Sequence, residues 1–146
     1  GEPDVMLELF GLSKEADNRA VGPPVDIKWT RNRKNRFHNL MFLDTAAENL
    51  AGISGIYVIW HGGAGSRWLY VGATQDLSKT LDAKIDNPEI ERYYDRVGVY
   101  VTWSLVKPEY HGGIVRYLTD TMKPEIDNPD AKRYAKEKPI AVFLPG

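Results

Sequence analysis

Two tyrosines, Tyr57 and Tyr70, lie in the part of the sequence best suited to chemistry. They fall in the apolar segments GIYVIW and RWLYVGA, which flank the glycine-rich stretch HGGAGS. Two segments rich in β-branched and aromatic residues around a glycine-rich turn predict an antiparallel hairpin. If the hairpin is symmetric about Gly63 and Ala64, Tyr57 stands directly opposite Tyr70 on one sheet face. Their phenols could then serve one pocket, because directly opposed residues have Cβ atoms about 5 Å apart.

The same symmetric register assigns a second set of side chains to the other face of the hairpin: Ile56, Val58, Trp60, Leu69 and Val71. Cross-strand aromatic pairs also stabilise ordinary sheets. The hairpin alone therefore favours a structural role for the two tyrosines.

The segments around the hairpin predict the elements that must position these tyrosines. Residues 76–85 form a helix with Asp76 as its N-cap. A strand follows over 98–106, a helix over 112–122 and a final strand over 138–146. Strands that pair first and are then covered by helices indicate an α+β fold, here a small antiparallel sheet with a central hairpin flanked by helices.

The chain divides into a domain over residues 54–146, which includes the C-terminal strand, and an N-terminal extension over 1–53 that packs on it. Within the extension, Thr45 and Glu48 have the spacing of a capping box and predict the start of a short helix.

The order of these pieces resembles the GIY-YIG nuclease domain. GIY at 55–57 and YVG at 70–72 are followed by a helix, a strand and a helix ending in KPEIDN, so the resemblance covers roughly residues 54–128. The C-terminal PIAVFLP is also similar to the end of some bacterial GIY-YIG proteins.

The resemblance implies cleavage of phosphodiester bonds with one divalent metal. Tyr57 would activate the attacking water or hydroxyl, and Tyr70 would support it by hydrogen bonding. In the family, an arginine on the first helix stabilises charge on the phosphate and a glutamate on the last helix holds the metal. An asparagine after the proline of that helix completes the set.

Two of the family's charged positions carry other residues in this chain. Thr80 stands at the place of the arginine, and Val115 at that of the glutamate. Asp127 stands at the place of the asparagine, with Asn128 beside it. Lys84 lies one helical turn after Thr80. It is a better substitute for the arginine than Lys79, because helical side chains lean toward the N-terminus and Lys84 therefore leans toward the place of Thr80.

We therefore expect a degenerate GIY-YIG domain with impaired catalysis, no metal ligands and no cofactor, magnesium or manganese serving only if the domain is active. A lone His111 near the last helix is more typical of a structural residue. Two alternatives stay open. The domain could be a catalytically dead scaffold for protein contacts. It could also be an active, divalent-metal-dependent endonuclease, if Thr80 and Val115 have been matched to the wrong family positions.

A basic run precedes the domain and predicts a contact with nucleic acid. Phosphates pair with clustered cations, and the interleaved Trp29 and Phe37 could stack on unpaired bases. A solvated basic loop is an equally good interpretation for a chain of net charge −1. The four cations assigned to binding are Arg31, Arg33, Lys34 and Arg36.

Composition limits the remaining function classes. The chain has no cysteine, which excludes disulfides, thiolate nucleophiles and cysteine-built zinc sites. No signal peptide and no apolar run of about 18 residues is recognised, so we expect a cytoplasmic protein without a membrane partner. The partners that remain are DNA and another protein.

Overall fold

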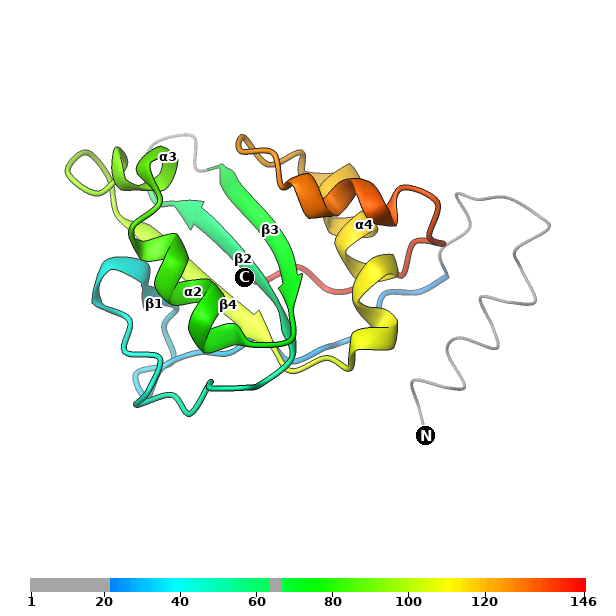
Figure 1. Cartoon of the computed structure of the whole chain (residues 1–146), viewed down its shortest axis with the longest axis horizontal. Helices are drawn as coiled ribbons and strands as arrows, with labels where there is room; N and C mark the ends of the chain where they lie inside the picture. The colour runs from blue at the N-terminus through cyan, green and yellow to red at the C-terminus, as the bar shows by residue number, and fades with distance from the viewer. Residues whose placement is uncertain (1–21, 64–66) are drawn as a thin grey trace.

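A four-stranded antiparallel sheet forms the centre of the computed structural model, which describes residues 22–63 and 67–146 (Figure 1). This confirms the α+β fold class. The strands lie in the spatial order β1-β4-β2-β3, so the predicted hairpin of β2 and β3 occupies one side of the sheet. Their bounds are His38–Asn39 for β1, Gly55–His61 for β2, Trp68–Thr74 for β3 and Val99–Ser104 for β4.

The helices are short and begin at recognisable capping residues. Asp76 is the N-cap of α2, as predicted, and its carboxylate accepts from the Lys79 amide. Asn87 caps α3 in the same way, with Pro88 in the first turn. The bounds are Leu77–Ile85 for α2, Pro88–Glu91 for α3 and His111–Met122 for α4, with 3₁₀ turns at Leu40–Phe42 (η1), Pro108–Tyr110 (η2) and Pro129–Tyr134 (η3).

Each face of the sheet carries its own apolar cluster. On the first face, α2 and α3 cover the sheet with Leu77, Leu81 and Ile90 (Figure 1). On the second face, α4 contributes Val115 and Leu118, among other residues. Alternation along β2 sends successive side chains to opposite clusters, as the pleat of a strand requires. The two faces are called below the α2 face and the α4 face.

The described part of the extension, residues 22–53, is built into the sheet. Its residues His38 and Asn39 form β1, and Leu40 and Leu50 are buried in the cluster of the α2 face. Residues 50–53 also hold the start of α2, because the amides of Leu77 and Ser78 donate to carbonyls there. The first 21 residues of the predicted extension lie outside the described residues.

The predicted capping box at Thr45 is wrong. Asp44 accepts from the amides of Ala46 and Ala47, and residues 45–49 form turns without becoming a helix. The Thr45 hydroxyl donates to Asp82 of α2 and accepts from Ser78, so tertiary contacts take the group that capping needs.

The C-terminal segment pairs at one point where a strand over 138–146 was predicted. Val142 forms a parallel bridge with Val25, supported by hydrogen bonds from the Val25 and Phe143 amides. Pro139 and Pro145 flank this point and have no amide hydrogen to donate, which limits longer pairing.

Among the described residues, no helix combines the length and the apolar character that crossing a bilayer requires.

Candidate functional site

Tyr57 and Tyr70 lie side by side on the α2 face, although not in the predicted register. Tyr57 pairs with Gly72, and Tyr70 pairs with Ile59, so the direct opposition of the two tyrosines is wrong by two residues. Their rings are nevertheless stacked, with centroids 6.0 Å apart and planes inclined by 10°. The two tyrosines are thus diagonal neighbours on one face.

A bulge in β3 explains part of the changed register. Between the pairs Ile59–Tyr70 and Trp60–Trp68, Leu69 is an extra residue without a partner in β2. Leu69 therefore packs in the same cluster as Tyr70, and its predicted place on the opposite face is wrong. Ala64, at the predicted centre of the turn, lies outside the described residues.

Gly72 makes room for the Tyr57 hydroxyl. A Cβ atom at position 72 would lie 2.5 Å from this hydroxyl oxygen and 3.0 Å from Nδ2 of Asn128. The first distance is too short for a real contact and the second is tight, so any side chain here would displace its neighbours. The glycine of the YVG motif thus brings a tyrosine hydroxyl and an asparagine amide to the same place on the sheet.

Both phenols are held in the neutral form. Burial raises the pKa of Tyr57 far above its usual value, and the neighbouring Tyr70 adds to the rise. Burial and the carboxylate of Asp130 raise the pKa of Tyr70. The interaction between the two hydroxyls adds to the rise in the pKa of Tyr57 and opposes the rise in the pKa of Tyr70. Neither phenol is suited to accept a proton at neutral pH.

Lys84 of α2 supplies a cation at the tyrosine pair. Its Nζ atom lies 3.9 Å from the centroid of the Tyr70 ring, the geometry of a cation–π contact. Burial lowers the pKa of Lys84, while the carboxylates of Asp130 and Glu89 raise it. The sequence indicated Lys84 as the substitute for the missing arginine, and the structure places its ammonium group against one of the two tyrosines.

Thr80 and Val115, the two positions that differ from the family pattern, lie in different parts of the structure. The Thr80 hydroxyl is 2.7 Å from the Thr74 hydroxyl at the end of β3. Val115 is fully buried in the cluster of the α4 face, together with Ile56 and Val58. The structure therefore does not bring Val115 together with Tyr57, which points to the opposite face.

His111 has a structural environment, as expected. His111 is the first residue of α4, and its Nε2 atom lies 2.7 Å from the carbonyl oxygen of Val106, which precedes η2. Burial lowers the pKa of His111. It therefore stays with the helix end and does not join the tyrosines.

Asn128, and not Asp127, lies at the tyrosine pair. Its Nδ2 donates to the Val71 carbonyl at 3.0 Å, and its Oδ1 accepts from the Asp130 amide. The preceding residues follow the outer edge of β3, where the amides of Glu125 and Ile126 donate to carbonyls of Trp68 and Leu69. The sequence comparison put Asp127 at the place of the family's asparagine and named Asn128 only as the next residue.

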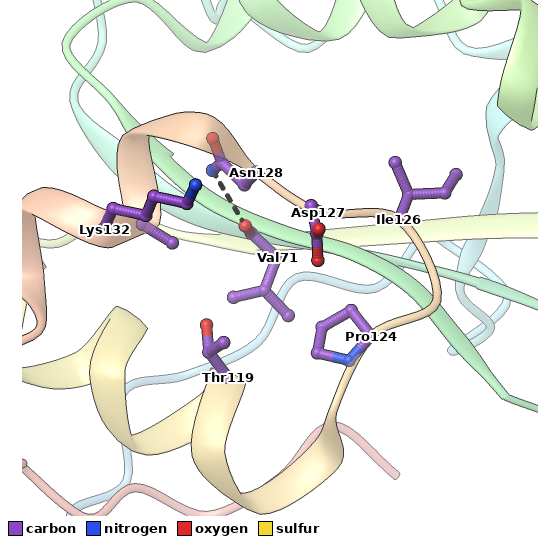
Figure 2. A pocket seen from close by; sticks show the side chains of 8 residues that line it. Val71, Thr119, Pro124, Ile126, Asp127, Asn128 and Lys132 are labelled. Atoms are coloured by element: carbon purple, nitrogen blue, oxygen red, sulfur yellow. Dashed lines mark hydrogen bonds between the residues drawn. The ribbon is translucent and has the colours of Figure 1, made fainter.

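A pocket of about 220 Å³ lies on the other side of Asn128, between α4 and the segment that covers β3 (Figure 2). Figure 2 shows the hydrogen bond from Asn128 to Val71 at its rim and Lys132 on the η3 side. Asn128 therefore borders both the pocket and the tyrosine pair. The pocket is lined by Val71, Thr119, Pro124, Ile126, Asp127, Asn128, Ala131 and Lys132.

The residues at the tyrosine pair do not fit a divalent cation. The charges that act on the phenols come from the carboxylates of Asp130 and Glu89, and Lys84 places an ammonium group among them. Within residues 22–63 and 67–146, no three acidic or histidine side chains cluster as a metal site would require. Val115, at the place where the resemblance would put a glutamate, is a buried apolar residue.

The four predicted nucleic-acid-binding residues form a separate group. Arg31, Arg33, Lys34 and Arg36 are all exposed, in a turn that leads into β1. Arg31 lies over the ring of Phe37, which contacts Trp60 on the α4 face. The structure therefore does not join this basic turn to the tyrosine pair.

Comparison of the chain with protein-family models, with curated proteins and with solved structures gave no match.

Proposed function

We propose that this chain is a GIY-YIG-like domain that binds the phosphodiester backbone of nucleic acid and cleaves it poorly or not at all. The observation that carries the proposal is the position of the Lys84 ammonium group against the ring of Tyr70, which stacks on the ring of Tyr57. A fixed cation next to hydroxyl donors is suited to a phosphate oxygen.

The protonation of the tyrosines supports binding over cleavage. A neutral phenol donates a hydrogen bond to a phosphate oxygen but is a poor base for a water molecule. Because the pKa values of Tyr57 and Tyr70 are both raised, the pair stays in the donating form at neutral pH. Asn128 adds an amide whose Nδ2 already holds the β3 backbone in place.

Two missing groups support weak catalysis. Lys84 is a point charge and lacks the planar fork with which an arginine binds two phosphate oxygens. No carboxylate replaces the glutamate at position 115. Positioned charges of this kind each contribute about a hundredfold or more to rate, so the loss of both removes most of the activity.

Binding is tested with a labelled DNA duplex over a range of salt concentrations. Lys84→Gln should weaken binding about tenfold and flatten the salt dependence by about one phosphate contact. Lys79→Gln is the matched control, because Lys79 is an exposed lysine of the same helix. Equal affinities for the two variants would contradict the proposed site.

Cleavage is tested by nicking of supercoiled plasmid in magnesium or manganese. We expect little or no nicking by the parent protein. Robust nicking that Tyr57→Phe abolishes would overturn the impaired-catalysis part of the proposal and favour an active endonuclease.

Exposed apolar side chains favour a second candidate, a catalytically dead scaffold for protein contacts. Phe42 is 79% exposed and Leu105 66% exposed, and both side chains are available for contact with a partner. The scaffold would be supported by two results together. The parent protein would bind no DNA in the salt titration, and the Phe42→Ser variant would lose binding to a protein partner.

A further inference from the structure

The basic turn at residues 31–36 is held in one conformation by its own backbone. The Asn32 amide donates to the Arg36 carbonyl at 2.7 Å, and the Asn35 amide donates to the Asn32 carbonyl at 2.9 Å. The Asn32 side chain accepts from the amides of Lys34 and Arg36. Asparagine side chains that accept from nearby amides are typical of ordered turns.

Both ends of the turn are attached to β4. Before the turn, the Thr30 amide donates to the Trp103 carbonyl, and the Thr102 hydroxyl donates to the Thr30 carbonyl. After it, His38 of β1 pairs with Val101. A turn fixed at both ends loses little conformational entropy when a ligand binds to it.

Arg31 is part of this framework, whereas the other three cations point to solvent. The Arg31 guanidinium donates to the carbonyls of Asn35 and Gly146 and lies 4.1 Å from the Phe37 ring centroid. Arg33, Lys34 and Arg36 are exposed, and none of them is in an ion pair with another described residue. Three free cations are therefore presented by a rigid turn.

A ladder of aromatic rings lies beside the turn. Phe37 meets Trp60 edge to face at 4.9 Å, and Trp60 stacks on Tyr100 at 6.1 Å. All three side chains are partly exposed. Tyr100 lies close over Gly62 and Gly98, where added Cβ atoms would come within 2.6 and 2.8 Å of it. Side chains at those two positions would clash with the ring.

We propose that the basic turn and the aromatic ladder form a binding surface for single-stranded nucleic acid. Arg33, Lys34 and Arg36 contact successive phosphates, and an unpaired base stacks on the ladder. A basic turn alone would suit a duplex equally well. The exposed rings favour a single strand, because the face of a base in a duplex is covered by its neighbours.

This surface is separate from the tyrosine pair. Trp60 packs with the cluster of the α4 face, whereas Tyr57 and Tyr70 belong to the cluster of the α2 face. One phosphate therefore does not contact both Lys84 and the basic turn. The inference goes beyond the proposed function and does not depend on it.

The test is a fluorescence-anisotropy titration of the full chain with a single-stranded oligonucleotide of about 12 nucleotides and with its duplex. Substitution of Arg33, Lys34 and Arg36 by glutamine should weaken single-strand binding at least tenfold and lower the salt slope by about 2. A control variant replaces three other exposed lysines, Lys79, Lys107 and Lys136, by glutamine and should bind like the parent.

The ladder is tested with Tyr100→Leu and, as a second variant, Phe37→Leu, each checked for folding by thermal unfolding. A folded ladder variant should lose at least fivefold affinity for the single strand and little for the duplex. Equal losses for both nucleic acids would overturn the single-strand assignment. Binding of polyglutamate in place of the oligonucleotide would overturn the proposal in favour of an acidic protein partner.

This experiment distinguishes binding at the basic turn from binding at the tyrosine pair. A loss of affinity with the triple glutamine variant but not with Lys84→Gln would support the basic turn and contradict the tyrosine site. The reverse pattern would contradict the basic turn. Parent-like binding by the triple variant at all salt concentrations overturns the inference directly.

Discussion

Gly72→Ala is the most direct test of the packing at the tyrosine pair. The new methyl group would lie 2.5 Å from the Tyr57 hydroxyl oxygen and 2.7 Å from the Cζ atom of the same ring. Tyr57 is 3% exposed in the middle of β2, so its ring has little freedom to move away.

The expected cost follows from two opposing effects. Overpacking of a core of this kind costs about 1–3 kcal/mol. Replacement of a strand glycine by alanine returns about 0.5–1 kcal/mol of conformational entropy. We therefore expect Gly72→Ala to lower the free energy of unfolding by about 1–2 kcal/mol.

The measurement is urea unfolding followed by tryptophan fluorescence, in which the midpoint should fall by about 1 M. Tyr57→Phe removes the oxygen atom nearest to the new methyl group but leaves the ring. The double variant should therefore be more stable than the sum of the single changes predicts, although the ring atom Cζ keeps part of the clash. A Gly72→Ala protein as stable as the parent, or strictly additive effects, would refute the close approach of Tyr57 to Gly72.

Three further predictions concern single groups. Val115→Glu should lower the free energy of unfolding by about 3 kcal/mol or more, because it places a carboxylate in the apolar cluster of the α4 face. Combined with Thr80→Arg it should not restore plasmid nicking, and recovered nicking would contradict the placement of Val115. Asp76→Ala should destabilise the protein at neutral pH, since Asp76 caps α2 and accepts from the Gly52 amide. The pKa of Asp76 is lowered in the folded state, so this difference should shrink as the pH falls below 3.8, and unfolding measured across that range checks it. Burial raises the pKa of Tyr94 to about 12, so its contribution should be present below pH 10 and be lost as the pH rises toward 12. A Tyr94→Phe protein should show a weaker loss of stability over that window in urea titrations, whereas an unchanged profile would contradict the prediction.

Local patterns in the sequence predicted the elements well. Asp76, a polar residue before regularly spaced leucines, gave the start of α2, because capping depends on neighbouring residues alone. The symmetric hairpin register also placed Tyr57 and Tyr70 on one face; that placement is confirmed although the register is wrong, because a shift of two residues keeps a side chain on the same face.

The failures involve contacts between distant residues. The bulge at Leu69 shifts the hairpin register, and the edge segment at 125–126 donates to carbonyls next to it, which no pattern within the hairpin reveals. Val115 fits a family position by counting from Pro124, but residue counting does not show which side of the sheet α4 covers.

The position of Lys84, in contrast, could be predicted from the sequence, because helical side chains lean in a known direction.

The segment that follows α4 also affects how the protein behaves in a crowded solution. A long strand at a sheet edge can pair with a strand of another chain and so begin aggregation. Along β3, the carbonyls of Trp68, Leu69 and Val71 are already occupied by the amides of Glu125 and Ile126 and by the side chain of Asn128. The opposite edge of the described sheet is β1, which is only two residues long.

Asn128 therefore links the tyrosine pair to the solubility of the whole chain. A substitution that removes its amide would free a carbonyl on the edge strand β3 and loosen the segment that shields it. Such a variant would tend to self-associate through β3, so its loss of ligand binding would be accompanied by aggregation that grows with protein concentration.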